Sequence, residues 1–120
     1  MSRIYYTLRM ETIKIVLYTS TTEKQPFADW LRKLDSGTKT IVAARLARIK
    51  ANNFGDCKRI VGSSGVHELR IDHGTGYRIY YGKKGTTIVV LLVGGNKGSQ
   101  NRDIAKAKQY WLDFKEQKYD

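Results

Sequence analysis

The chain has 120 residues, 41% of them hydrophobic, which fits one globular domain with a single core. Its 22 lysines and arginines outnumber 11 acidic residues, and the resulting charge of +11 favours an anionic partner such as nucleic acid, an acidic protein or a membrane surface. No apolar run is long enough to cross a bilayer, and we expect no secretory signal at the N-terminus. The single cysteine, Cys57, excludes an internal disulfide and a cysteine-based zinc site, so we expect a cytoplasmic protein.

The first half of the chain predicts one strand followed by two helices. Residues 1–11 show no clean period, and we expect them to form a loosely ordered leader. Residues 13–18 are rich in β-branched and aromatic side chains and predict a strand. Pro26 suits the first turn of a helix. A second helix is expected over about 38–53, with Val42, Leu46 and Ile49 facing inward and Arg45 off that stripe. Because the break between these helices is short, we predict an antiparallel helical hairpin.

The second half predicts a sheet and a final helix. Residues 57–61 predict a short edge strand, and the alternation in 66–72 and 77–81 predicts two more strands. Residues 88–93 have no polar side, which predicts a central strand covered on both faces. A helix is expected from about 99 to 118, with Ser99 as its cap.

This order of elements predicts a single α+β domain over residues 1–120. We expect an antiparallel sheet of about four strands, packed against the N-terminal helical hairpin, with the C-terminal helix added to it.

Cations occupy one side of the alternation in the predicted sheet. Pairing the apolar sides of the two middle strands brings Arg70 and Arg78 onto one polar face, and Lys97 arrives from the loop after the central strand. Three such groups could bind a phosphate and stabilise charge developing on it. Alternatively, they form ion pairs with Glu68 and Asp72 and only keep the sheet soluble.

Other candidate groups are weaker. The glycine-rich residues 94–100 lie between a strand and a helix N-terminus, where anions bind, although a plain turn explains them equally well and the spacing is not that of a nucleotide-binding loop. Alternation places His67 on the apolar side, whereas His73 lies in a turn, so a two-histidine mechanism is disfavoured. No carboxylate cluster indicates a metal site, and we expect no cofactor. Alternation assigns Tyr77 and Tyr81 to the core, and only Tyr80 is predicted on the polar face, where it could stack on a base.

Three stretches together resemble a known family. They are Gly65 to Ile71 (GVHELRI), Gly76 to Tyr81 (GYRIYY), and Leu91 to Gln100 (LLVGGNKGSQ), the last followed by RDIA. In these stretches the chain resembles the RelE/ParE toxin superfamily, and within it the addiction-module killer proteins close to the HigB-type toxins. The resemblance covers about residues 13–114 and is most specific in the second half.

The resemblance implies a toxin of a bacterial type II toxin–antitoxin pair. Such toxins commonly cleave mRNA in the ribosomal A site and are neutralised by a cognate antitoxin, here expected to be a small helix-turn-helix protein. Related ribosome-dependent nucleases use no metal, and a 2′-hydroxyl attacks the scissile phosphate to give a cyclic phosphate.

The resemblance also assigns roles by position. Arg78 matches a phosphate-stabilising arginine, Arg70 falls where the family often has a basic residue, and Lys97 follows the last central strand as another. Glu68 stands where a second basic residue is often found, and no tyrosine follows Lys97 at the usual short distance. Glu68 could therefore be the base that deprotonates the 2′-hydroxyl, which an arginine cannot do. The residues expected to contact RNA are Tyr80, Lys83, Lys84, Gln100 and Arg102.

Two alternatives remain open at this point. One is a ParE-like poison of DNA gyrase, which acts by binding without nuclease chemistry. The other is an RNA- or antitoxin-binding module that has the fold but no activity. The basic face favours the nuclease, because a gyrase poison does not need cations arranged around a phosphate.

Overall fold

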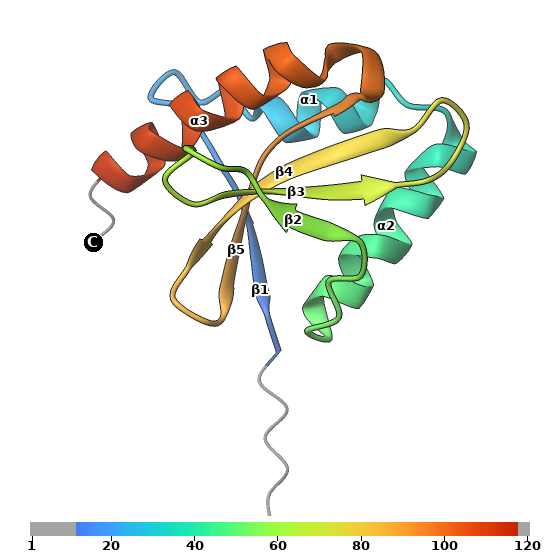
Figure 1. Ribbon diagram of the computed structural model, residues 1–120, viewed down its shortest axis with the longest axis horizontal. Helices are drawn as coiled ribbons and strands as arrows, with labels where there is room; N and C mark the ends of the chain where they lie inside the picture. The colour runs from blue at the N-terminus through green and yellow to red at the C-terminus, as the bar shows by residue number, and fades with distance from the viewer. Residues whose placement is uncertain (1–11, 118–120) are drawn as a thin grey trace, which may run out of the picture.

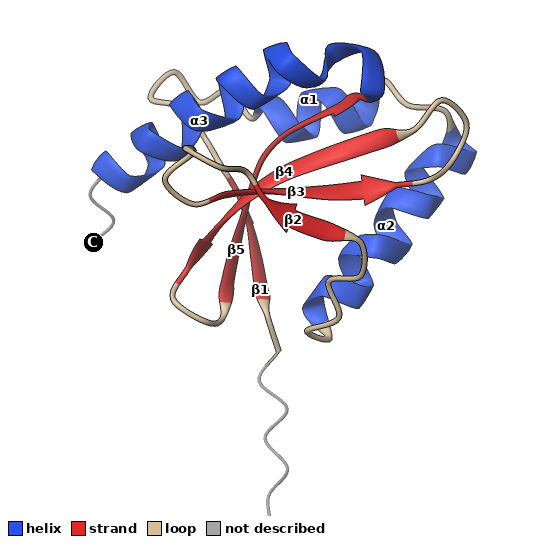
Figure 2. Cartoon of the chain, in the orientation of Figure 1, coloured by secondary structure: helices blue, strands red, loops and turns tan. Residues whose placement is uncertain are grey.

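Five strands form one twisted sheet with helices on both faces (Figures 1 and 2). The computed structural model describes residues 12–117, so the predicted leader lies outside the described residues. The strands are β1 (Lys14–Leu17), β2 (Cys57–Arg59), β3 (Val66–Ile71), β4 (Tyr77–Lys84) and β5 (Ile88–Asn96). The helices are α1 (Pro26–Arg32), α2 (Ser36–Lys50) and α3 (Gln100–Glu116), and a short 3₁₀ turn over Lys97–Ser99 joins β5 to α3. The predicted α+β class and order of elements are confirmed.

The sheet is mixed, whereas the sequence predicted an antiparallel one. Its strand order is β1-β5-β4-β3-β2, and every neighbouring pair is antiparallel except β1 and β5. Lys14 pairs with Ile88, and Leu17 pairs with Leu91 in the same direction. Alternating hydrophobicity identifies a strand but gives no information about the direction of a partner far away in the chain, so this pairing was missed.

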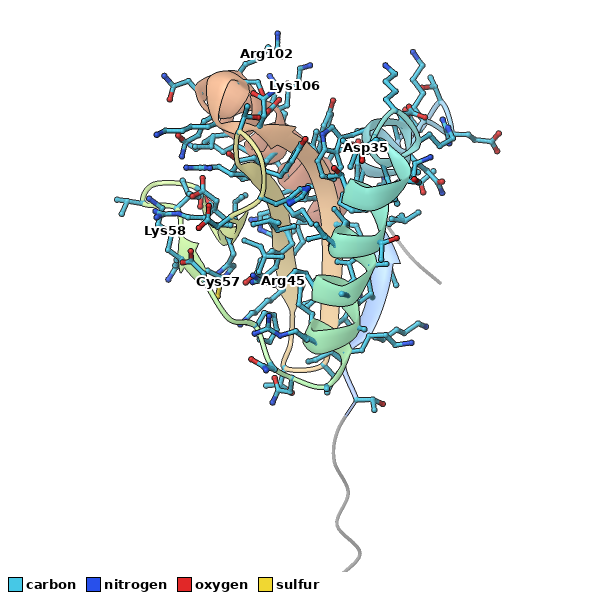
Figure 3. The ribbon with its side chains drawn as sticks, turned by 90° about the vertical axis from the view of Figure 1, so that its right-hand side faces the viewer. Asp35, Arg45, Cys57, Lys58, Arg102 and Lys106 are labelled. Atoms are coloured by element: carbon cyan, nitrogen blue, oxygen red, sulfur yellow. The ribbon has the colours of Figure 1, made fainter. Side chains whose placement is uncertain are left out.

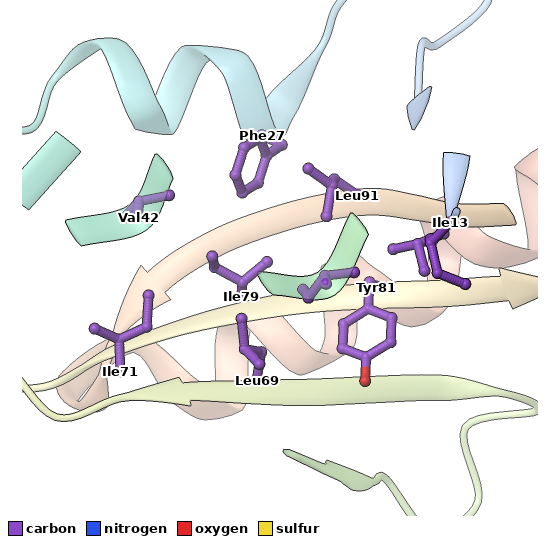
Figure 4. Packing of buried hydrophobic residues seen from close by; sticks show 10 residues of the cluster. Ile13, Phe27, Val42, Leu69, Ile71, Ile79, Tyr81 and Leu91 are labelled. Atoms are coloured by element: carbon purple, nitrogen blue, oxygen red, sulfur yellow. The ribbon is translucent and has the colours of Figure 1, made fainter. Parts of the chain in front are cut away.

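The sheet has an apolar core on each face. On one face, α1 and α2 contribute Phe27, Val42 and Ile49, which pack on alternate residues of β3, β4 and β5 (Figure 4). On the other face, α3 contributes Ala107, Trp111 and Phe114. β5 serves both cores: Val89 and Leu91 face α1 and α2, and Val90 and Leu92 face α3. The prediction of a strand covered on both faces is therefore confirmed.

Local signals explain where α2 begins and ends. The Asp35 carboxylate accepts hydrogen bonds from the Thr38 backbone N–H at 3.1 Å and the Thr38 hydroxyl at 2.6 Å. These hydrogen bonds lower the pKa of Asp35, and they start the helix at Ser36, two residues before the predicted position. Asn52 follows the helix with φ of 63°, the left-handed conformation expected of a helix end.

Two glycines let helices approach the sheet closely. A side chain at Gly82 of β4 would overlap the ring of Trp111 in α3, and one at Gly94 of β5 would overlap Trp30 in α1. Each tryptophan thus lies directly on strand backbone. No helix among residues 12–117 is both long enough and apolar enough to span a membrane.

We predict that Gly82→Ala lowers the free energy of unfolding by about 1–3 kcal/mol, because the added methyl group displaces the Trp111 ring from a filled core. Urea denaturation followed by circular dichroism measures the loss. In a Trp111→Ala background, the same substitution should cost much less. An equal cost in both backgrounds would show that contact with Trp111 is not the reason.

Candidate functional site

A cleft of about 320 Å³ opens where the turn between β3 and β4 meets the segment that follows β5. The side chains of Arg70, Arg78 and Lys97 all line it. Arg70 and Arg78 are direct cross-strand partners in β3 and β4, and Lys97 comes immediately after Asn96, the last residue of β5. The structure therefore brings together the three cations that the sequence placed on one face.

The carboxylate of Glu68 joins the two arginines. Its side chain is fully buried, with Oε1 3.2 Å from Nε of Arg70 and Oε2 3.6 Å from Nε of Arg78. Nε2 of Gln100, the first residue of α3, donates a 2.9 Å hydrogen bond to Oε2. Arg70 remains 40% exposed and Arg78 13% exposed, so the arginines lie between Glu68 and solvent.

The electrostatic environment keeps Glu68 ionised. Burial alone would raise its pKa, but the hydrogen bonds from Gln100 and Arg70 and the charge of Arg78 outweigh that effect and lower the pKa. A charge in this position costs desolvation energy, which its three partners offset. With both oxygens facing these donors, Glu68 is poorly placed to take a proton from a ligand in the cleft. The carboxylates that line the cleft are those of Asp56 and Asp72.

The sequence suggested that the polar side of β3 and β4 is an open surface, but the structure shows it partly covered by α3. Tyr80 has no exposed surface and packs in the core beneath α3, so the expectation that it presents its ring to a base is wrong. Burial and the nearby Glu68 carboxylate raise the pKa of Tyr80, so its hydroxyl stays protonated at neutral pH. The predicted positions of Tyr77 and Tyr81 on the opposite core are correct.

A second hollow, of about 540 Å³, adjoins the first at the start of α3. It is lined by residues 96–102 and shares Lys97 with the cleft. The side chain of Asn96 accepts a hydrogen bond from the Ser99 N–H at 3.0 Å, and the Ser99 hydroxyl accepts one from the Asn96 N–H at 3.2 Å. This reciprocal cap fixes the backbone beside Lys97. Ser99 stands at the N-cap position of α3, as the sequence predicted, but its side chain makes no capping hydrogen bond there and instead completes the capping box that Asn96 begins.

The residues predicted to contact RNA fall into two groups. Gln100 and Arg102 line the second hollow, and Figure 3 shows Arg102 beside Lys106 on α3. Lys83 and Lys84 lie at the far end of β4, roughly 20 Å from Arg78 at the usual strand rise. There the Lys83 ammonium lies 4.3 Å from the centre of the Phe54 ring. The structure therefore does not bring these two lysines to the cleft.

Arg45 supports the cleft and was missed as a contributor. From α2 it donates to the backbone carbonyl of Arg70 at 3.2 Å and to that of Phe54 at 2.9 Å, bridging the helix to β3 (Figure 3). The sequence interpretation placed it off the inward stripe. Its spacing of three residues after Val42 and four before Ile49 is nevertheless that of the buried face and could have identified it.

Neither histidine is among the residues that line the cleft. His67 is half-buried and stacks on Tyr81 with ring centres 5.2 Å apart, as its side of the alternation suggested, and burial with the charges of Lys83 and Arg59 lowers its pKa. His73 is exposed in the turn after β3. Within residues 12–117, no three histidine, cysteine, aspartate or glutamate side chains gather as metal ligands would.

Comparison with known proteins identifies the family. The model of a family described as "Phage derived protein Gp49-like (DUF891)" matches residues 29–111. The chain belongs to the Gp49-like family. An uncharacterized protein of Haemophilus influenzae is 43% identical over 83 residues, which make up 68% of this chain and 82% of the relative. The region shared with Gp49-like proteins runs from α1 into α3 and includes Glu68 and the three cations of the cleft.

The lowered pKa of Glu68 predicts a pH-dependent stability for this Gp49-like protein. The unfolded chain binds the proton more readily, so the contribution of Glu68 is fully present above about pH 4.5 and is lost as the pH falls through its lower folded pKa. Denaturation with urea between pH 6 and pH 3 should show the stability gap between wild type and Glu68→Gln shrinking. A gap that stays constant would contradict the assignment of an ionised Glu68.

Proposed function

We propose that this protein is the toxin of a type II toxin–antitoxin pair and that it cleaves mRNA on the ribosome. The observation that carries the proposal is the convergence of Arg70, Arg78 and Lys97 on one cleft, two of them held by a buried carboxylate. The charge of +11 supports a polyanionic substrate, and the resemblance to RelE/ParE toxins supports the reaction.

In the proposed mechanism, the scissile phosphate of the message occupies the cleft. Arg70 and Arg78 donate hydrogen bonds to its non-bridging oxygens and stabilise the negative charge that builds up in the transition state. The 2′-hydroxyl of the preceding nucleotide attacks the phosphorus, and the bond to the 5′-oxygen breaks. The proton lost by the 2′-hydroxyl is balanced by the proton that the leaving 5′-oxygen takes up. The products are a 2′,3′-cyclic phosphate and a 5′-hydroxyl. Lys97 adds a third positive charge, and the second hollow with Gln100 and Arg102 offers room for the adjoining nucleotide.

The proposal includes a cytoplasmic setting and three partners: the ribosome, mRNA and a cognate antitoxin. The proposed reaction needs neither a cofactor nor a metal, because the message supplies the attacking 2′-hydroxyl. We propose a small helix-turn-helix antitoxin with an acidic segment that covers the basic cleft, since complementary charge would both speed and stabilise the complex.

We predict that expression without an antitoxin arrests growth and truncates translated messages, and that Arg78→Ala reduces message cleavage by about 100-fold or more. Northern blots and mapping of message ends measure the cleavage. Arg32→Ala removes the same charge from an exposed site on α1 and should leave cleavage unchanged. Growth arrest with intact message and broken DNA would instead support a gyrase poison, and arrest by folded R78A equal to wild type would place the active surface elsewhere.

We also predict that the toxin–antitoxin complex weakens as salt rises, because charges on the rim of the cleft are screened. Isothermal titration at 50 and 500 mM NaCl measures the effect. Arg70→Ala should flatten the salt dependence and Arg32→Ala should not. An affinity independent of salt would show that the antitoxin binds away from the cations.

A further inference from the structure

Glu68 is a buried negative charge that the proposed mechanism does not use for proton transfer. Each of its oxygens faces a different arginine, with Nε of Arg70 at 3.2 Å from Oε1 and Nε of Arg78 at 3.6 Å from Oε2. Oε2 also accepts the hydrogen bond from Gln100 at the start of α3. One carboxylate thus connects β3, β4 and α3 directly behind the cleft.

We infer that Glu68 is a positioning residue: it holds Arg70 and Arg78 side by side so that their outer N–H groups meet one phosphate. The inference rests on the proposed function in that the anion is taken to be a phosphate of RNA. It replaces the role of general base that the sequence suggested for Glu68.

The contacts with Glu68 orient the guanidinium groups of the two arginines. A guanidinium has five N–H donors in a rigid plane, so a carboxylate that faces Nε leaves the outer end, formed by the two terminal nitrogens, free to donate to another acceptor. For Arg78, Nη1 lies 3.9 Å from the point where a side chain at Gly76 would begin, in the turn that lines the cleft. The inner edge of Arg78 therefore meets Glu68 while its outer end reaches the cleft.

The repulsion between Arg70 and Arg78 explains why a carboxylate is needed beside them. Arg70 and Arg78 are direct cross-strand partners, and like charges in that position repel each other. Glu68 offsets one of the two charges and leaves a net charge of +1 on the trio, to which Lys97 adds another. The two arginines can thus remain close together. Asp56 and Asp72 also line the cleft, so attraction for a phosphate there depends on the directed N–H groups of the arginines and on the overall charge of +11, not on a surplus of cations in the lining.

Gln100 extends the same arrangement to α3. Gln100 is the first residue of the helix, three residues after Lys97, and its side-chain amide donates a hydrogen bond to the Glu68 carboxylate. A shift of Glu68 would therefore disturb both the two arginines and the segment that carries Lys97. The relative positions of the cations that line the cleft therefore depend on one shared carboxylate.

The test compares wild type with Glu68→Gln, which keeps the size and removes the charge. The probe is a short oligoribonucleotide with 2′-O-methyl groups, which cannot be cleaved. We expect E68Q to bind it about tenfold more weakly or worse, since hydrogen bonds to charged groups are lost. The NMR signals of the Arg70 and Arg78 Nε–H groups should exchange faster with water. Cleavage of an unmodified message should show a raised KM with an unchanged pH profile.

Other results of these measurements would contradict the inference or the proposed function. Equal affinity and equally slow Nε–H exchange in E68Q would overturn the inference. Loss of kcat with unchanged affinity and slow exchange would also overturn it, because Glu68 would then act as the base. If wild type itself does not bind the probe, the proposed function fails, and the Nε–H exchange still shows whether Glu68 holds the arginines.

A second variant decides the question if E68Q does not fold. Gln100→Ala removes one partner of Glu68 from the start of α3, and we expect faster exchange at the Arg78 Nε–H. Gln109→Ala, at an exposed position on the same helix, is the matched control and should leave that signal unchanged. Unchanged exchange in both variants would contradict the coupling.

Discussion

The buried carboxylate of Glu68 is the interaction on which the site depends. It lies in the polar side of β3 and β4, yet α3 covers that side, so the charge has no access to water. Such burial is unfavourable unless the charge is paired and hydrogen-bonded. Here Arg70 and Arg78 pair the charge, and Arg70 and Gln100 donate hydrogen bonds to it. The same contacts that make the charge tolerable also orient the arginines toward the cleft. The Glu68 carboxylate therefore contributes both to the stability of the fold and to the geometry of the cleft.

The close packing of helices on the sheet places this group correctly. Gly82 admits Trp111, and Gly94 admits Trp30, so α3 and α1 both lie against strand backbone. At Gly95 a side chain would overlap the carboxylate of Asp103, which is buried at the start of α3. Gly95 thus allows the first turn of α3 to lie close to the sheet, where Gln100 hydrogen-bonds to Glu68. The glycine-rich segment thus has a packing role whatever ligand it binds.

Much of the fold and part of the site follow from sequence. Alternation located β3 and β4, the uninterrupted apolar run located β5, and Pro26 marked the start of α1, because each signal is local. Alternation also placed Arg70 and Arg78 on one face. It did not show that α3 covers this face, since a buried ion cluster has the same pattern as a solvated surface, and Tyr80 was misplaced for that reason. The direction of β1 depends on a partner at the other end of the chain and has no local signal.

The position of β1 has a consequence for synthesis. Among the strands of residues 12–117, β1 pairs with β5 alone, so it cannot pair until β5 has left the ribosome. Contacts this distant in the chain form late, and domains generally complete their fold only when such segments are available. Lys97 and Gln100 also lie beyond β5. The cleft therefore cannot assemble until β5 and the start of α3 have left the ribosome, which delays any activity of the cleft during synthesis.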